Sequence, residues 1–198
     1  REDFAYCGMR RSNRNLLRQR ADADSLAEQL IEHRPASITD INLQAGEDPV
    51  AARTVALPLI RALRRATNLG ISVCLGSLAA DLCDELREAG ASIYVLKFEV
   101  ANAERYGRLQ APGTLSERLE RVRYLADSGW EVSSGFIAGL PGQTTTELVE
   151  NLELARRLPL FGCSVSPFIP GEATPLYSAK TASLGLALNC MAALRLMR

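Results

Sequence analysis

Cys7 is the cysteine best placed for chemistry in this chain. Gly8 follows it directly, and Arg10, Arg11 and Arg14 come shortly after. Neighbouring cations stabilise a thiolate, which is the reactive and metal-binding form of cysteine. Cys7 is therefore a candidate for thiolate chemistry, and a surface cysteine in a basic loop is the alternative. The other cysteines lie in apolar stretches away from this loop and are expected to be small core residues: Cys74, Cys83, Cys163 and Cys190.

Two carboxylates and one arginine suggest a site for a charged small molecule. Gly46 and Glu47 directly follow a predicted strand, where the glycine lets another molecule approach and the carboxylate can receive an ammonium group. Glu99 also follows a strand, and Arg118 lies early in the next helix. A carboxylate and a guanidinium facing one cleft can hold both charged ends of an amino acid. The alternatives are a Gly-Glu-Asp-Pro turn at 46–49 and a structural salt bridge.

Two loops rich in glycine and proline follow later strands. Residues 139–144 form a tight turn before a capped helix, where an anion can bind. Residues 167–176 predict a rigid loop with an apolar wall over the strand ends. The alternative to anion binding at residues 139–144 is a loop that only connects the strand to the helix, with a shape imposed by the fold. His33, the only histidine, lies at a helix end, so neither a catalytic triad nor a histidine metal site is available.

Alternating apolar and amphipathic segments must position these residues. Five apolar runs predict strands at 38–45, 70–76, 92–98, 130–138 and 161–168. Amphipathic stretches predict helices at 24–33, 50–67, 78–89, 114–128, 144–157 and 183–198. Capping boxes at 114–117 and 144–147 mark two helix starts, and Gly90 and Gly129 mark two helix ends. Pro58 should kink the helix that contains it.

The alternation predicts an α/β fold whose parallel strands are buried on both faces, with helices outside. An open doubly wound sheet and a barrel are the two ways to arrange it. The absence of GxGxxG after the first strand weakens a dinucleotide-binding sheet. Polar residues at the carboxyl ends of successive strands favour a TIM-type (βα) barrel. These positions are Gln44–Asp48, Ser77, Lys97, Glu99, Gly139–Gln143 and Ser166–Thr174.

Charge and length narrow the function classes. Lys plus Arg and Asp plus Glu are both 23, and this balance argues against nucleic acid and anionic membranes as partners. No apolar run reaches the roughly 18–20 residues that a membrane span needs. The odd number of widely spaced cysteines argues against a disulfide framework and fits a reducing cytoplasm. The chain is expected to be one domain over residues 1–198.

Five motifs occur in a fixed order along essentially the whole chain. They are Tyr-Cys-Gly-x-Arg-Arg-x-Asn at 6–13, Gly-Glu-Asp-Pro at 46–49, Phe-Glu-x-Ala-Asn at 98–102, Gly-Leu-Pro-Gly-Gln-Thr at 139–144, and Pro-Phe-Ile-Pro at 167–170 with Thr-Pro-Leu at 174–176. Together they resemble the radical S-adenosylmethionine (SAM) enzymes of the biotin synthase-like group. The resemblance is greatest to the [FeFe]-hydrogenase maturases of the HydE type. Methylornithine synthases (PylB) and biotin synthases are more distant.

The resemblance implies a radical SAM core, here expected as a fragment that lacks the first and the last barrel strands. It implies a [4Fe–4S] cluster and SAM at the carboxyl ends of the strands. In this family the cluster reduces the sulfonium, and the resulting 5′-deoxyadenosyl radical attacks a small-molecule substrate. The implied role is HydE-like, in maturation of the [FeFe]-hydrogenase H-cluster, with a flavodoxin or ferredoxin as reductant. Methylornithine synthase-like or biotin synthase-like activity is the alternative.

The resemblance also implies roles for individual residues. Cys7 matches the third cysteine of the cluster loop, and Lys97 matches a basic residue that faces the substrate cavity. Glu47 belongs to the motif that receives the SAM amino group, and Arg118 matches the position that binds the SAM carboxylate. The residues expected around SAM are Tyr6, Gly46, Glu47, Ser72, Glu99, Arg118, Ile137, Gly139 and Leu140.

The chain departs from the family pattern in the cluster loop. The family motif is Cys-x3-Cys-x2-Cys, and its middle cysteine falls on Phe4 while its first would precede Arg1. One thiolate cannot hold a four-iron cubane. A degenerate, cluster-free module that binds SAM or another amino acid is therefore a second hypothesis, and a structural remnant without function is a third.

Overall fold

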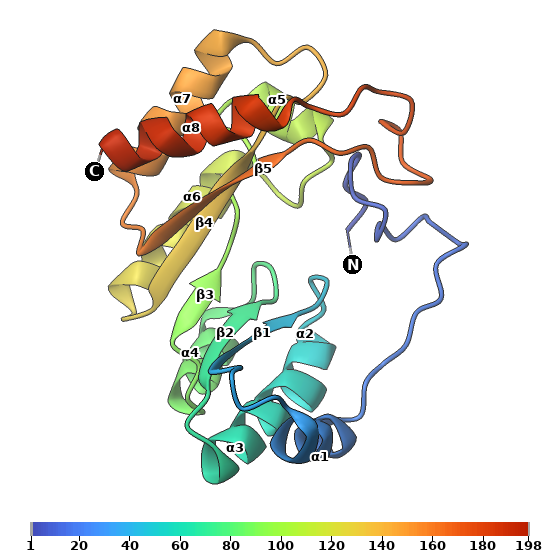
Figure 1. Cartoon of the computed structure of the whole chain (residues 1–198), viewed down its shortest axis with the longest axis vertical. Coiled ribbons are helices and arrows are strands. Elements are labelled where there is room, and N and C mark those ends of the chain that lie inside the picture. The colour runs from blue at the N-terminus through green and yellow to red at the C-terminus, as the bar shows by residue number, and fades with distance from the viewer. Residues whose placement is uncertain (1, 198) are drawn as a thin grey trace.

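Five parallel strands form the centre of the computed structural model, which describes residues 2–197 (Figure 1). In sheet order they are β1 Asp40–Gln44, β2 Gly70–Cys74, β3 Ile93–Val95, β4 Glu131–Ala138 and β5 Gly162–Pro167. In a barrel wall the strands lie side by side in the same order as in the sequence. In a doubly wound sheet the strand order reverses at a switch point. The α/β fold of the TIM-barrel kind is thus confirmed, with β1 and β5 as the edges of the described sheet.

The helices follow the strands as expected, with one addition. They are α1 Ala23–His33, α2 Pro49–Ala51, α3 Leu57–Ala66, α4 Ala80–Glu88, α5 Ala103–Arg108, α6 Leu115–Asp127, α7 Thr145–Arg157 and α8 Leu184–Leu196. Both predicted capping boxes are present. The short helix α5 was not predicted, although the Asn102 side chain caps it by accepting from Arg105 N. Arg198, the last residue of the final predicted helix, lies outside the described residues.

Pro58 acts at the junction of two helical segments. The predicted helix 50–67 is divided into α2, a π-helical stretch η1 at Ala52–Ala56, and α3, which begins one residue before the proline. Proline has no backbone N–H to donate to the preceding turn, and a π-bulge is one common response to such a gap in the helical hydrogen bonds. The predicted helix is thus interrupted by a change of helix type just before Pro58.

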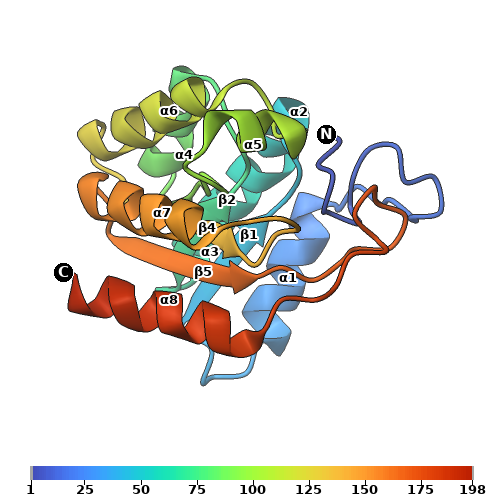
Figure 2. The same ribbon diagram turned by 90° about the horizontal axis from the view of Figure 1, so that it is seen from above.

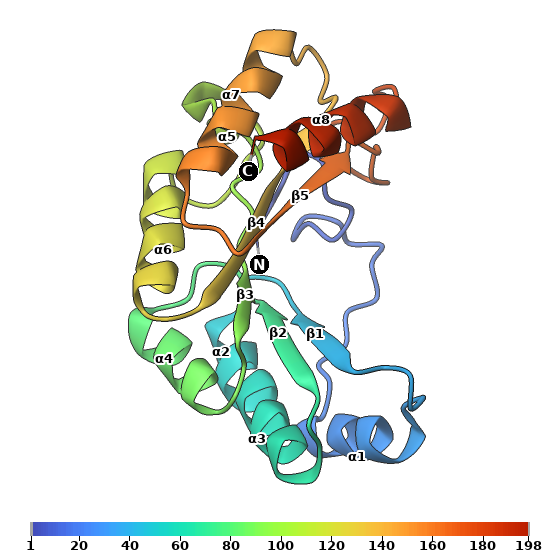
Figure 3. The same cartoon turned by 60° about the vertical axis from the view of Figure 1, so that its left-hand side comes forward.

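The hydrophobic core fills the space between the sheet and the helices. Alternate strand residues point into it and are buried, among them Val73, Tyr94 and Phe136. Leu63 of α3 and Leu125 of α6 face them and are 0% exposed. Burying one large apolar side chain contributes about 1.5–3 kcal/mol. Figure 3 shows the result, with α4, α6 and α7 on one side of the strands.

Along β1 and β2 the opposite face of the sheet is polar and open, so the expectation of strands buried on both faces is wrong for these two strands, whereas β4 is buried on both faces from Ser134 onward. Asn42 and Gln44 of β1 are exposed on this face, in register with Ser72 and Cys74 of β2. Asn42 Nδ2 donates to Ser72 Oγ at 2.7 Å. Side chains alternate along a strand, so the apolar residues of these strands all face the helices and leave the polar ones on the other side.

The segment that contains Cys7 crosses the carboxyl ends of the strands and lies beside the loop that follows β5 (Figures 1 and 2). Ala5 N donates to Leu109 O at 2.8 Å, and Leu176 N donates to Ala5 O at 3.4 Å. The two loops also approach at Gly171, where an added Cβ would lie 2.8 Å from Tyr6 O. Residues far apart in sequence are thus brought together over the strand ends.

Candidate functional site

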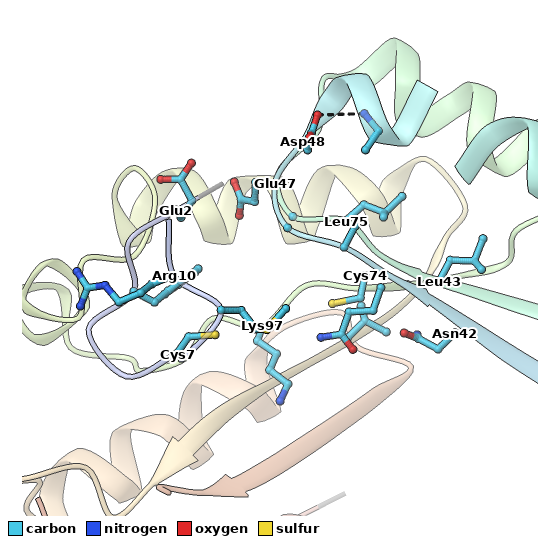
Figure 4. Close-up of a pocket in the computed structure, with 18 of the residues that line it drawn as sticks. Glu2, Cys7, Arg10, Asn42, Leu43, Glu47, Asp48, Cys74, Leu75 and Lys97 are labelled. Carbon is cyan, nitrogen blue, oxygen red and sulfur yellow. Dashed lines mark hydrogen bonds between the residues drawn. The ribbon is translucent and has the colours of Figure 1, made fainter. Parts of the chain in front are cut away.

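A cavity of about 1070 Å³ lies at the carboxyl ends of the strands, beneath the N-terminal segment (Figure 4). Most of the predicted site residues line it: Tyr6, Cys7, Gly46, Glu47, Lys97, Glu99, Arg118 and Ile137. Its size reaches the upper end of the range for small-molecule sites, about 300–1,000 Å³. The tertiary structure thus brings these residues from five parts of the chain into one cavity.

Arg118 is paired with Glu47, whereas the sequence suggested Glu99 as its counterpart. Arg118 Nη2 donates to Glu47 Oε1 at 2.9 Å, and Arg118 Nε donates to the Tyr106 hydroxyl at 3.1 Å. The side chains of Arg118 and Glu47 are 5% and 18% exposed. Burial opposes the charge on Arg118, but Glu47 and Tyr106 outweigh it and raise the pKa of the guanidinium. An acidic and a basic group are therefore held together in the cavity wall.

The ends of β1 and β2 together position Glu47. Asp48, the next residue, caps α2 by accepting from Ala51 N at 3.0 Å, which fixes the backbone after β1. Gly76, after β2, has a φ of 77°, and a Cβ there would lie 1.9 Å from Glu47 Cγ. Only glycine leaves room for the Glu47 side chain at this point and adopts this backbone conformation without strain.

Glu99 lies at a break in the sheet after β3. Its φ is 66°, and its carbonyl accepts from Ile137 N at 2.9 Å in a bridge to β4. A left-handed conformation in a non-glycine residue is uncommon and often marks a functional position. Burial raises the pKa of the Glu99 carboxyl, while Lys97, the Tyr6 hydroxyl and Arg118 act in the opposite direction. Glu99 therefore places a carboxyl group near Tyr6, four residues after the end of β3.

Lys97 extends into the cavity from the same segment (Figure 4). Its Nζ donates to Ser166 Oγ of β5 at 3.0 Å. No carboxylate of the described residues lies within ion-pair distance of it, whereas Arg10, Arg20 and Arg118 of the same lining are each paired with an acid. The ammonium group of Lys97 is thus available to bind an anionic group of a ligand in the cavity.

Asn42 and Cys74 are among the lining residues that the sequence did not indicate as site residues. Cys74 was expected in the core, away from Cys7, but both cysteines line this cavity. Burial raises the pKa of the Cys74 thiol, and Lys97 opposes the shift. The signal was the alternation in residues 40–44 and 70–74, which places every second, mostly polar residue on the face away from the core.

Three predicted residues, Ser72, Gly139 and Leu140, do not belong to the lining. Ser72 donates to Ile41 O at 3.1 Å between β1 and β2. The Gln143 side chain accepts from Gly139 N at 2.6 Å and from Leu140 N at 3.3 Å. Two of the backbone donors that an anion could use, Gly139 N and Leu140 N, are thus already engaged within the loop.

The N-terminal loop does not provide a ligand set for an iron–sulfur cubane. Phe4, which stands at the second motif position, packs against Tyr6 with ring centroids 5.3 Å apart. Among residues 2–197, no group of three or more His, Cys, Asp or Glu side chains is arranged to hold a metal ion. A cubane with one iron open for a small ligand needs three thiolates, and Cys7 offers one from this loop. The described residues therefore do not fit the cluster.

Comparison with known proteins identifies a family match over most of the chain. Residues 5–155 match the model described as the radical SAM superfamily. The [FeFe] hydrogenase maturase subunit HydE of Thermotoga maritima is 30% identical over 197 residues, which are 100% of this chain and 56% of the relative. Biotin synthase of Streptomyces avermitilis is 36% identical over 111 residues, covering 55% of this chain and 28% of that protein.

Solved structures agree with this match at the level of the fold. Methylornithine synthase (PylB) superposes with a TM-score of 0.89 at 23% identity, covering 100% of this chain and 58% of that one. The maturase HydG superposes with a TM-score of 0.79 at 18% identity, covering 99% of this chain and 47% of that one. The chain thus spans somewhat more than half the length of HydE. No helix within residues 2–197 has the length and apolar character to cross a bilayer.

Proposed function

The chain belongs to the radical SAM superfamily, and from this premise we propose that it binds SAM in the cavity over the strand ends. Members of this superfamily are enzymes. The observation that carries the proposal is the pair of Glu47 with the buried Arg118, whose Oε1 and Nη2 atoms are 2.9 Å apart, in the wall of a cavity of about 1070 Å³. These two charges complement the ammonium and the carboxylate of an amino acid.

In this proposal the amino-acid end of SAM binds between Glu47 and Arg118 and replaces their direct ion pair. Glu47 receives the ammonium group, and the fork of Arg118 receives the carboxylate, so that one ion pair becomes two. Tyr6 and Ile137, which both line the cavity, supply an aromatic and an apolar surface for the adenosine part. Glu99 contributes a carboxyl beside Tyr6 that can accept from a ribose hydroxyl. Gly46 keeps the backbone open where the ligand approaches.

Lys97 and Ser166 form the substrate side of the same proposal. They line the same cavity, and they offer a cation and a hydroxyl to a small molecule. The role proposed for the whole protein is HydE-like, in [FeFe]-hydrogenase maturation. It is supported by 30% identity over the full length of this chain.

The described loop limits the chemistry assigned to this chain. Because Cys7 is its single thiol and Phe4 occupies the position of the middle cysteine, no electron-transfer step is assigned to the loop. A flavodoxin or ferredoxin would act as reductant only if the full-length protein holds a cluster, so this partner is proposed on that condition. The residues themselves bind and orient SAM, and the segment above them excludes water from one side of the cavity.

Calorimetry with SAM tests this proposal on the full-length protein, prepared under anaerobic conditions with and without iron reconstitution. We expect heat of binding with SAM in both preparations, and a loss of that heat in Arg118→Met. Absence of SAM binding in both preparations would falsify the proposal. Formation of 5′-deoxyadenosine under reducing conditions is measured in the same samples, because it reports directly on the HydE-like reaction.

A further inference from the structure

Tyr106 lies behind the Glu47–Arg118 pair and connects it to the protein interior. Its ring is buried in the core at 1% exposure, and its hydroxyl donates to Pro112 O at 3.0 Å. A phenol has one proton. Since that proton is used by Pro112, the hydroxyl oxygen turns its lone pairs to the cavity side, where it accepts from Arg118 Nε at 3.1 Å.

The hydrogen bond from Arg118 Nε to the Tyr106 hydroxyl determines which edge of the guanidinium faces the cavity. With Nε engaged by Tyr106, Arg118 directs Nη2 to Glu47. A guanidinium recognises a carboxylate through two parallel donors, so its orientation decides whether the pairing is bidentate. Arg118 is 5% exposed and has little water to replace a lost partner.

Tyr106 belongs to helix α5, and the neighbouring residue Arg105 fixes the position of this helix. Arg105, the preceding residue, donates to both carboxylate oxygens of Glu147, at 2.6 and 2.9 Å. It also donates to Pro141 O at 3.0 Å and to Gly142 O at 2.9 Å. The helix is thus fixed to α7 and to the 139–144 loop, while Tyr106 projects inward to Arg118.

We propose that Tyr106 is a positioning residue that sets the orientation of Arg118 and thereby the selectivity of the cavity for ligands with a free carboxylate. The inference rests on the proposed SAM site, in which Arg118 binds the carboxylate. It goes beyond that site by assigning carboxylate selectivity to a buried hydroxyl that touches no ligand. A nucleoside thioether without the amino-acid end gains nothing from this hydroxyl.

The test compares SAM with 5′-methylthioadenosine, which lacks the amino-acid end, by calorimetry on the full-length protein. Tyr106→Phe keeps the ring and removes the acceptor for Arg118 Nε. We expect SAM affinity to fall about tenfold, since a hydrogen bond to a charged group is lost, while affinity for 5′-methylthioadenosine is unchanged. Tyr124→Phe is the matched control, because its hydroxyl donates to Asp84 of α4 and not to Arg118.

A double-mutant cycle with Arg118→Lys tests whether Tyr106 acts through Arg118. Lysine has no Nε–H in this geometry, so Tyr106→Phe should add little to the loss already present in Arg118→Lys. Equal losses for SAM and 5′-methylthioadenosine in Tyr106→Phe, or additive losses in the cycle, would overturn the inference and leave SAM binding itself intact. If the unmodified protein binds neither ligand, the proposed SAM site fails and the inference fails with it.

Discussion

Glu47 and Arg118 illustrate how a binding site depends on single side chains. Neither residue is unusual in the sequence, but together they form an ion pair with both members largely shielded from water. Removing one member of a buried pair leaves the other charge without compensation, which costs far more than losing an exposed pair. The site is therefore most sensitive to substitutions that remove one charge.

Glu47→Gln should weaken SAM binding while the protein remains folded. The variant keeps the size of the side chain but cannot compensate the charge of the SAM ammonium or of Arg118. We expect a loss of affinity of about 10–100-fold, the range for a hydrogen bond to a charged group. Calorimetry with SAM measures it, and Glu153→Gln on the exposed face of α7 is the control. Equal affinities in Glu47→Gln and the unmodified protein would contradict the assignment.

Phe4→Cys should change the iron content of the full-length protein. The substitution places a second thiol three residues before Cys7, in the spacing of the family motif. We expect more iron and sulfide per chain after anaerobic reconstitution than in the unmodified protein, and a higher yield of 5′-deoxyadenosine. Val149→Cys, which adds a thiol to exposed α7, is the control. A full complement of four irons in the unmodified protein would show that other residues supply the ligands.

At the scale of elements, α5 and α7 brace the cavity from outside. Glu147 closes the capping box of α7 and also binds Arg105 of α5 through both oxygens. One carboxylate thus links a helix start, a neighbouring helix and, through Arg105, the 139–144 loop. The hydrogen bonds from Arg105 and from Thr144 N lower the pKa of Glu147 from 4.5 to about 2.

The link at Glu147 predicts a loss of stability in acid. A carboxyl whose pKa is lower in the folded state stabilises the protein above its unfolded pKa of 4.5, and that contribution is lost as the pH falls through about 2. Urea unfolding between pH 5 and pH 2 should therefore show a smaller decrease in the free energy of unfolding for Glu147→Gln than for the unmodified protein.

Arg105→Met is a second variant for the same prediction. It removes the largest cause of the shift without changing the carboxyl, so the acid-dependent loss of stability should decrease in the same direction. The prediction is wrong if both variants show the same acid-dependent decrease as the unmodified protein.

At the scale of the whole molecule, the cavity is closed by contacts between distant parts of the chain. The N-terminal segment is held by the α5–α6 connection at Leu109 and by the loop after β5 at Leu176. Gly171 allows the closest approach, since a Cβ there would lie 2.8 Å from both Gly8 N and Tyr6 O. Those atoms are backbone and cannot move aside as a flexible side chain would.

Gly171→Ala should displace the segment that carries Tyr6 and Cys7. We expect faster proteolytic cleavage within residues 9–22 and weaker SAM binding, while the core and its unfolding in urea change little. Gly107→Ala is the matched control, because a Cβ there meets nothing within 4 Å. Identical cleavage rates in the two variants would show that the contact at Gly171 does not hold the segment.

The sequence by itself determined the order of strands and helices, the barrel class and a group of eight residues that line the cavity. These features depend on local signals, namely apolar runs, capping boxes and motifs in a fixed order, and each can be read within a few residues. Helix α5 escaped notice because its six residues carry no apolar periodicity. Cys74 lies outside the predicted site because residues 70–76 predict a continuously buried strand, whereas the residues of β2 alternate between the core and the cavity.

Only the tertiary structure decided which charges meet. Glu47 and Arg118 are 71 residues apart, and their pairing depends on the adjacent ends of β1 and β2 and on the room that Gly76 leaves. Glu99, the nearer candidate by sequence, lies in the left-handed backbone after β3, and among the described residues Arg118 forms its ion pair with Glu47 instead. Pairing energies fall off within a few ångströms, and distances on that scale are fixed by packing between elements rather than by the composition of any one of them.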